Sequence, residues 1–354
     1  MALEVMDRHA VKKPALRRPM LVPVFALAAI LLATMLIAAG VGAAPLPLSE
    51  IIGAVLGRQH LTAMEASILF SIRLPRIFAA AMVGSALSVS GLLFQGLFRN
   101  PLADPYVIGS SGGAVLGASI GVFLLPPLSV AGFSLTALLA FGGATCSILL
   151  VYALASVNGR TPVVALLLAG FAVSTMLGYS SYFLESLDRD FGAGMRALIS
   201  WLHGTITQPT WPQLAIEAAM LALAYGASVP IAARLNTLAL GEEYALSLGL
   251  DVQRTRISLI VAGSVLTASA VALGGMISFV GLIVPHAMRL LFGSDHLRLL
   301  PSTALAGAIF LLVADTFART ILAPAELPVG VFTACLGAPF FLYLLRQAKA
   351  ETLL

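Results

Sequence analysis

The sequence predicts an all-α, polytopic membrane protein with about ten transmembrane helices. Hydrophobic residues make up 59% of the 354 residues and charged residues only 10%, and the mean hydropathy is +1.00. Soluble domains carry about 25% charged residues, so much of this surface must face lipid. An apolar stretch of about 20 residues crosses the hydrocarbon core of a bilayer as a helix, and this chain holds ten such stretches joined by short loops.

The ten predicted spans follow these apolar stretches in chain order. The first is longer than the apolar core of a cleaved signal peptide, which has about 7–15 residues, so we expect it to remain as a span. We expect residues 1–19 to form an N-terminal tail, 20–348 the transmembrane domain and 349–354 a C-terminal tail. The approximate spans are Met20–Ala44, Ile77–Phe98, Tyr106–Leu125, Leu135–Ala155, Val163–Phe183, Leu214–Ala232, Ile257–Leu273, Ile277–Phe292, Ser302–Phe317 and Val329–Leu345.

The distribution of positive charge predicts the orientation. If the N-terminus is cytoplasmic, 14 of the 20 Lys and Arg residues fall on the cytoplasmic side. The positive-inside rule then places both termini in the cytoplasm. Membrane topology accounts for the net charge of +4, and we expect no nucleic-acid partner. The six basic residues on the outer side are Arg58, Arg73, Arg76, Arg189, Arg196 and Arg319.

Residues 73–105 carry the most informative motif. Arg73-Leu-Pro-Arg precedes an apolar helix expected over Ile77–Phe98, and Arg99-Asn-Pro-Leu-Ala-Asp-Pro follows it. Pro75 suits the first turn of a helix, where its missing N–H would have no partner in any case. The Asn-Pro and Asp-Pro pairs end the helix and predict a short, structured turn.

Two further motifs occur in the C-terminal third. One covers Gly275–Arg289 and continues through the turn Gly293–Pro301, and the other covers Ala325–Phe341. Together with the 73–105 motif, these motifs resemble those of the FecCD-type permeases in sequence, order and spacing. FecCD-type permeases are the membrane subunits of ATP-driven importers for iron chelates, haem and cobalamin. The resemblance covers about residues 45 to 348. The family's usual Asp-His-Arg reads Asp295-His-Leu-Arg298 here, with the arginine displaced by one position.

The resemblance implies the fold of cobalamin and haem importer permeases, and a multi-pass location in the bacterial inner membrane. It also implies the partners: a second copy of the chain, two copies of a cytoplasmic ATP-binding subunit, and a periplasmic substrate-binding protein. The chain has only three lysines, Lys12, Lys13 and Lys349, and none follows a glycine in the phosphate-loop pattern. We therefore expect no enzyme activity and no cofactor in this chain, with ATP and Mg²⁺ bound by the separate ATPase subunit.

The resemblance to FecCD-type permeases also implies a role for three arginines, Arg73, Arg76 and Arg319. In that family, arginines in these positions face the periplasm and meet glutamates of the binding protein. Guanidinium groups suit this task because they stay charged and bind carboxylates bidentately. The alternative is that these arginines only anchor helix ends at lipid headgroups. The motif favours docking.

The loop over residues 233–256 resembles the coupling helices that enter a groove on an ATPase subunit. Gly241 permits a sharp turn, Glu242 and Glu243 suit the first turn of a helix, and Gly249 suits its end. Leu240 precedes the turn, and we expect Tyr244, Ala245 and Leu248 to present a small apolar face. A helix lying on the membrane surface is the alternative, but the loop has few cationic residues for lipid headgroups.

The fifth span and two cytoplasmic segments are predicted to form the path and its gate. The family places this span beside the two-fold axis of the dimer, with the tenth nearby. Its small and soft residues would suit a smooth wall or ordinary helix packing, and branched apolar residues could close a pore by excluding water. The expected wall residues are Ala169, Ser174, Thr175, Met176, Gly178 and Ser181, and the expected gate residues are Asn100, Pro101, Leu102, Thr161, Val163 and Val164.

Other functions find less support in the sequence. His286 and His296 have no second ligand at helical spacing, so we expect no metal site. An ion-coupled secondary transporter needs ionisable residues inside the membrane, and only Glu217 and Asp315 qualify. The sequence of residues 99–105 resembles the haem permeases of the family most, and this resemblance implies haem as cargo, with a ferric siderophore or cobalamin as alternatives.

Overall fold

The computed structural model describes residues 21–42, 44, 46–57, 61–130, 132–156, 161–187, 192–206, 208–323 and 325–352. In these ranges the chain is almost entirely helical. Its only strands have two residues each and pair as one antiparallel hairpin. The elements are α1 (Leu21–Gly40), α2 (Leu48–Val55), α3 (Ala63–Ser67), η1 (Ile68–Arg73), α4 (Leu74–Phe98), η2 (Pro105–Ile108), α5 (Ser110–Phe123), β1 (Ser129–Val130), β2 (Phe133–Ser134), α6 (Leu135–Ala155), α7 (Val163–Leu187), α8 (Ala193–Leu202), α9 (Trp211–Leu238), α10 (Glu242–Ser247), α11 (Val252–Gly274), α12 (Val280–Phe292), α13 (His296–Ala318) and α14 (Val329–Thr352).

The predicted all-α polytopic fold is confirmed. Seven helical stretches in the described chain are long and apolar enough to cross a membrane, and the apolar stretches of α5, α12 and α14 are shorter. These ten elements match the ten predicted spans in order. Helix α14 continues to Thr352, through the first part of the segment expected to be a tail. Residues 1–19 lie outside the described residues.

The second span is longer than predicted. Pro75 lies in the first turn of α4, as predicted. Helical structure nevertheless runs without a break from Ala63 to Phe98, so this turn is inside a longer helical stretch. The π-helical turn η1 ends at Arg73, two residues before Pro75. A proline inside a helix removes one backbone donor and crowds the preceding turn, and a wider π turn at that place accommodates it.

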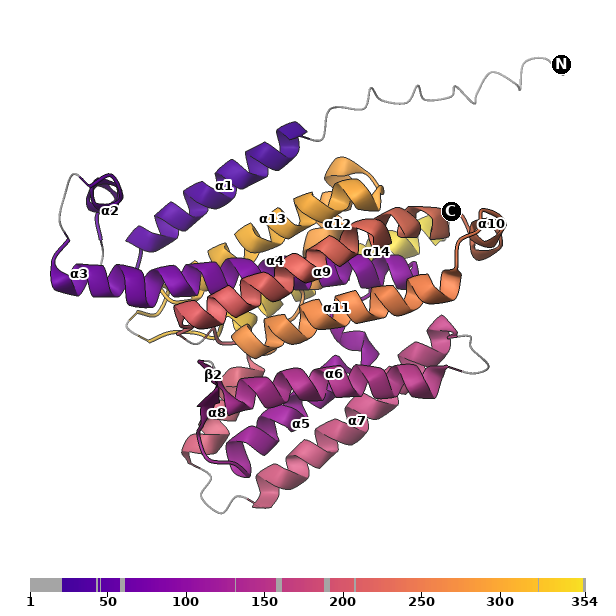
Figure 1. Cartoon of the computed structure of the whole chain (residues 1–354), viewed down its shortest axis with the longest axis horizontal. Coiled ribbons are helices and arrows are strands. Elements are labelled where there is room, and N and C mark those ends of the chain that lie inside the picture. The colour runs from indigo at the N-terminus through magenta and orange to yellow at the C-terminus, as the bar shows by residue number, and fades with distance from the viewer. Residues whose placement is uncertain are drawn as a thin grey trace.

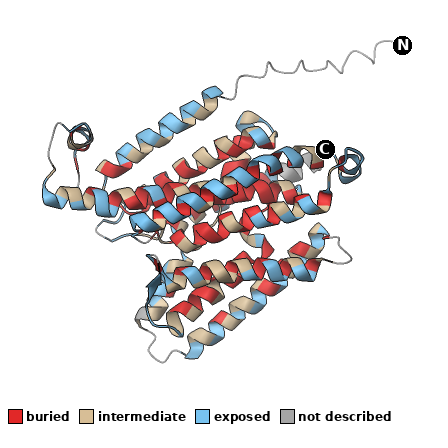
Figure 2. Ribbon diagram, in the orientation of Figure 1, coloured by how far each residue is buried: buried red, intermediate tan, exposed pale blue. Residues whose placement is uncertain are grey.

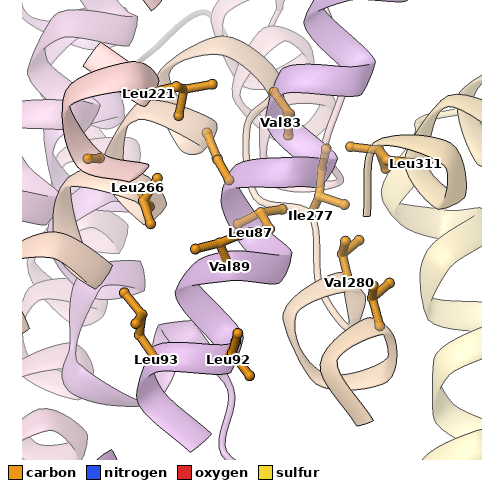
Figure 3. Close-up of a cluster of buried hydrophobic side chains, with 14 of the residues drawn as sticks. Val83, Leu87, Val89, Leu92, Leu93, Leu221, Leu266, Ile277, Val280 and Leu311 are labelled. Atoms are coloured by element: carbon orange, nitrogen blue, oxygen red, sulfur yellow. The ribbon is translucent and has the colours of Figure 1, made fainter. Parts of the chain in front are cut away.

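Helix α4 forms the centre of the molecule. In Figure 1 it runs through the main bundle, with α9, α11, α12 and α13 around it, and Figure 2 shows its length largely buried. Figure 3 shows its apolar side chains meeting those of the surrounding segments. The labelled residues are Val83, Leu87, Val89, Leu92 and Leu93 of α4, Leu221 of α9, Leu266 of α11, Ile277, Val280 of α12 and Leu311 of α13, all buried.

Glycines let the helices around α4 approach closely. A Cβ atom at Gly91 would collide with the carbonyl oxygen of Gly281 in α12, and one at Gly84 with that of Gly307 in α13. Small residues at helix contacts give close backbone packing in lipid. The positions of α12 and α13 against α4 are therefore fixed by backbone contact.

Helices α5, α6 and α7 form a second group, below the main bundle in Figure 1. Gly113 of α5 packs against Gly143 of α6. Helix α1 lies against α13 on the other side. The end of the bundle that carries α10 is called the α10 end below, and the other is called the opposite end.

Candidate functional site

A short helix projects at the α10 end, between α9 and α11, where a coupling helix was predicted. It begins after Gly241, which has φ +121°, and ends before Gly249, which has φ +77°. The side chains of Leu240, Tyr244 and Leu248 are exposed. An open cavity of about 500 Å³ is lined by Leu240, Gly241, Glu242, Glu243, Tyr244 and Ser247.

Ala245 differs from the expectation. It was assigned to the exposed apolar face, but it is fully buried. Its small side chain packs in the buried core and anchors α10 there. Tyr244 and Leu248 are four positions apart and share one face of the helix, whereas the adjacent residue Ala245 faces another way. The exposed face of this segment is built by Leu240, Tyr244 and Leu248.

Arg256 joins α10 to the segment before α7. Its guanidinium forms an ion pair with the carboxylate of Glu242, the first residue of α10. The same group donates to the carbonyl oxygen of Thr161 at 3.3 Å. Gln253, one turn earlier on α11, donates to the hydroxyl of Thr161 at 2.9 Å. Thr161 is fully buried, and two side chains of α11 hold this predicted gate segment.

Arg99 makes a similar connection for the turn after α4. Its backbone is left-handed, with φ +48°, which ends α4 and turns the chain. Its guanidinium donates to the carbonyl oxygen of Leu238 at 2.7 Å, at the end of α9. The Asn100 side chain accepts a hydrogen bond from the backbone N–H of Leu102 at 2.9 Å, so the predicted rigid turn is present.

The two predicted gate segments are not joined to each other within one chain. Among the described residues, no hydrogen bond or ion pair connects Asn100, Pro101 or Leu102 with the residues from 161 to 164. Val164 is exposed, and Val163 and Leu102 are partly buried. Each segment is instead held by an arginine to the stretch that contains α10. The gate assignment stays a prediction.

Helix α7 presents a largely exposed apolar face. Of the predicted wall residues, Thr175 and Met176 are exposed, and Ala169, Ser174 and Gly178 are partly buried. Ser181 was also predicted to line the path, but it is only 1% exposed. Its hydroxyl pairs instead with that of Ser119 on α5. The exposed face consists mainly of larger side chains at spacings of three, four or eight residues, which place them on one helix face: Val164, Leu168, Phe171, Tyr179 and Tyr182.

A buried charged cluster lies at the opposite end. Arg76 pairs with Asp315 of α13 at 3.0 Å and with Glu326 at 2.6 Å. Arg319 donates to the carbonyl oxygen of Ala38 at 2.6 Å, and Arg73 to that of Ala39 at 2.7 Å. The two arginines thereby satisfy the unpaired carbonyls at the C-terminal end of α1. Sequence analysis did not connect either carboxylate with these arginines.

The burial of this cluster bears on two predictions. Arg73, Arg76 and Arg319 are each less than a tenth exposed, so they do not simply extend into water or headgroups. They line a cavity of about 190 Å³ together with Glu326. Asp315, considered above as an ion-coupling residue, is paired with Arg76 and lies 3.9 Å from Arg319. Arg58 and Arg189 lie outside the described residues.

The two remaining polar candidates lie apart from these features. Glu217 is 1% exposed and its Oε1 has no hydrogen-bond partner in the described chain. The His296 ring nitrogen Nδ1 lies 2.9 Å from the amide oxygen of Asn236. Within the described ranges, no three His, Cys, Asp or Glu side chains are placed to hold a metal ion.

Asp295 fastens the start of α13 to the end of α9. Its carboxylate accepts hydrogen bonds from the N–H of Leu297 at 3.0 Å and from the Asn236 amide at 2.9 Å. Arg298 lies 3.6 Å from the same carboxylate. Burial opposes ionisation of Asp295, but the hydrogen bonds from Asn236 and the backbone outweigh it and hold the pKa below its ordinary value.

Comparisons with known proteins show the family of this chain. The model of the FecCD transport family matches residues 30–347. The cobalamin import system permease protein BtuC of Halobacterium salinarum is 46% identical over 285 residues, covering 80% of this chain and 74% of the relative. The hemin transport system permease protein HmuU of Yersinia pestis is 39% identical, covering 79% and 84%.

A further relative and a solved structure extend the match. The Fe(3+) dicitrate transport system permease protein FecD of Escherichia coli K12 is 39% identical, covering 80% of this chain and 86% of the relative. A solved inward-facing structure, described as a metal-chelate type ABC transporter, superposes with a TM-score of 0.79 at 30% identity, covering 92% of this chain and 98% of that one. This chain therefore belongs to the FecCD transport family.

Proposed function

We propose that this chain imports a metal chelate from the periplasm to the cytoplasm, as a homodimer that works with two ATP-binding subunits and a periplasmic binding protein. At the coarser level, the chain is a multi-pass permease subunit of an ABC importer. The dimer, the direction of the path and the roles of individual residues are parts of the proposal.

One observation carries the proposal: the projecting α10 segment is connected by arginines to both predicted gate segments. Arg256 joins Glu242 to Thr161, and Arg99 joins the turn at 99–102 to Leu238. If an ATPase subunit displaces α10 by binding its exposed apolar face, the displacement would be transmitted to both predicted gate segments through charged hydrogen bonds, which are short and directional. Coupling between distant sites needs such a contiguous physical connection.

The charged cluster supports docking of a binding protein at the opposite end. Three guanidinium groups and the carboxylate of Glu326 line the cavity of about 190 Å³. Asp315 supplies the second carboxylate of the cluster through its pair with Arg76, so one positive charge is in excess. Glu326 is the more exposed carboxylate, with its side chain 52% exposed. A carboxylate of the partner would find a complementary field there, which guides association and fixes register.

The cargo has two leading candidates. The wording of residues 99–105 favours haem, and a relative named as a hemin permease is 39% identical. Cobalamin is the second candidate, because the relative named as a cobalamin permease is 46% identical. Both cargoes are tetrapyrrole-type metal chelates, and both suit a wide path with few charged groups.

The proposed coupling is tested in liposomes that contain the permease, its ATPase subunit and the loaded binding protein. Arg256→Gln removes the ion pair to Glu242, and we expect ATP hydrolysis to continue while import falls about tenfold, the loss for ~1.4 kcal/mol of coupling. Arg254→Gln is the control, because Arg254 lies two residues away, is highly exposed and pairs only with Asp251 among the described residues. Equal import by both variants would contradict the assignment.

A further inference from the structure

An open, mostly apolar groove of about 570 Å³ lies between α9 and α11. Figure 1 shows these two helices side by side, with α10 joining them at one end. The lining of the groove runs from Met220 to Arg234 on α9 and from Ile257 to Val265 on α11. On α9 the lining residues follow one another at intervals of one or three residues, so they form a continuous stripe along one face of the helix.

Small side chains form the floor of the groove and larger ones form its rim. Ala224 of α9 and Ala262 of α11 line the groove and are buried. Leu223 and Val261 also line it, but both are exposed. In a membrane this exposed apolar surface meets lipid tails, and the space above the two alanines can hold one of them.

The groove has the length of one lipid leaflet. Helix α9 has 28 residues, or about 42 Å, which matches the ~40–45 Å of a bilayer with its headgroups. Arg234 precedes the end of α9 by one turn, and Ala224 lies at the middle of the helix. The rise from Ala224 to Arg234 is about 15 Å, half the thickness of the hydrocarbon core. The groove therefore runs from the centre of the bilayer to the headgroup boundary at the α10 end.

Arg234 gives the outer end of the groove a positive charge. It is exposed, and its guanidinium has no ion pair or hydrogen bond within the part of the chain that the structure describes. Arg254, one turn before Ser258, is already paired with Asp251 at 3.0 Å. The Ser258 hydroxyl donates to the backbone carbonyl of Arg254 at 2.8 Å. Since no Asp or Glu is among the lining residues, the free guanidinium of Arg234 can bind phosphate oxygens.

We propose that this groove binds one anionic phospholipid of the leaflet at the α10 end, with an acyl chain between α9 and α11 and the headgroup phosphate on Arg234. The apolar part gives no preference among lipids with the same tails, because the bilayer offers each tail similar surroundings. A basic group near the membrane surface attracts lipids with a net negative charge. The groove shares no lining residue with the cavity at α10, so the site does not depend on the proposed coupling or cargo.

The test uses the complete permease–ATPase complex in nanodiscs with two photoreactive phospholipids at equal concentration. Both carry the same diazirine-labelled tails; phosphatidylglycerol is anionic and phosphatidylcholine is zwitterionic. Cross-links are mapped by mass spectrometry. In the unmodified complex we expect the anionic lipid to label residues 220–231 and 257–265 about fivefold more than the zwitterionic lipid. Arg234→Gln should reduce this ratio to below about twofold, whereas Arg234→Lys should keep it because the charge remains.

Ala227→Phe tests whether the lipid tail occupies the groove. Ala227 is exposed and lines the groove, so a phenyl ring there would fill the space for the tail. We expect both lipids to lose most of their labelling of residues 257–265. Ala222→Phe is the matched control, because Ala222 is also an exposed alanine of α9 but does not line the groove. It should leave the labelling unchanged.

Arg346→Gln controls for general surface charge. Arg346 is exposed on α14 and does not line the groove, and α14 ends near α10 in Figure 1. The lipid ratio in the groove should therefore stay the same. An equal drop in Arg346→Gln and Arg234→Gln, or equal labelling in the two phenylalanine variants, would overturn the proposal. A groove that neither lipid labels in the unmodified complex would also overturn it and would assign this surface to a protein partner.

Discussion

The guanidinium of Arg99 donates a hydrogen bond to the carbonyl oxygen of Leu238 across 2.7 Å, although the two residues lie 139 positions apart. Leu238 is the last residue of α9, and α10 begins four residues later. The turn that follows the central helix α4 is therefore attached to the segment that leads into α10. Arg256 makes the equivalent attachment for the segment before α7.

Replacing Arg99 by glycine tests the first attachment. Glycine adopts the left-handed backbone of this position without strain, so Arg99→Gly removes the side chain and keeps the turn. We expect import to fall by about fivefold or more while ATP hydrolysis persists, as for loss of ~1 kcal/mol of coupling. Uptake by reconstituted complex is the measurement. A variant with normal import would show that the bond to Leu238 only stabilises the fold.

Gly241→Val tests the backbone of the coupling segment. Gly241 has φ +121°, which a β-branched residue cannot adopt without strain. A Cβ atom there would meet nothing within 4 Å, so the effect is conformational rather than a collision. We expect weaker stimulation of the ATPase subunit and reduced import, with the permease still folded. Gly142→Val is the control, because its Cβ would also meet open space but its φ is not positive.

Asp315→Asn tests the buried charged cluster. This change leaves Arg76 and Arg319 without their shared buried carboxylate, and breaking a buried ion pair costs about 3–5 kcal/mol. We expect a clear loss of thermal stability in detergent. Glu326→Gln should cost at most about 1 kcal/mol, because that side chain is half exposed and screened by water. Equal losses in the two variants would show that Asp315 is not the central carboxylate.

Asp295→Asn gives a pH-dependent prediction. The pKa of Asp295 is held below its ordinary value in the folded state, so its stabilising effect is present above the unfolded pKa of about 4 and is lost as the pH falls through the folded pKa. The variant should be less stable than the wild type at pH 7, by under about 1 kcal/mol because the side chain is partly exposed. The difference should narrow below pH 4 in thermal unfolding. A difference that does not change with pH would point to lost packing.

Smaller side chains at the predicted gate test whether these residues close the path. Leu102→Ala together with Val163→Ala removes apolar contacts that would exclude water from a closed path. We expect liposomes with the complex to leak cargo without ATP. Leu32→Ala with Leu36→Ala is a matched control, since these exposed leucines lie on α1, outside both segments. Unchanged passive flux in the Leu102 and Val163 variant would place the constriction elsewhere.

The sequence by itself determined the fold class, the order of the ten apolar elements and the position of α10. Each of these depends on local chemistry: apolar length sets a span, and glycines at 241 and 249 permit the left-handed backbone at both ends of the short helix. The rigid turn at Asn100 followed in the same way, because its hydrogen bond to Leu102 joins residues two positions apart.

Only the tertiary structure decided which charged groups meet. Arg76 pairs with Asp315 and Glu326, which lie 239 and 250 positions away, and Ser181 faces α5 rather than a path. The Tyr106 hydroxyl likewise accepts the N–H of Ile277, which lies 171 positions away. Such pairings depend on which helix faces meet, and that is set by close glycine contacts between helices rather than by any local pattern. Composition and motif order specify the elements, whereas packing specifies the sites.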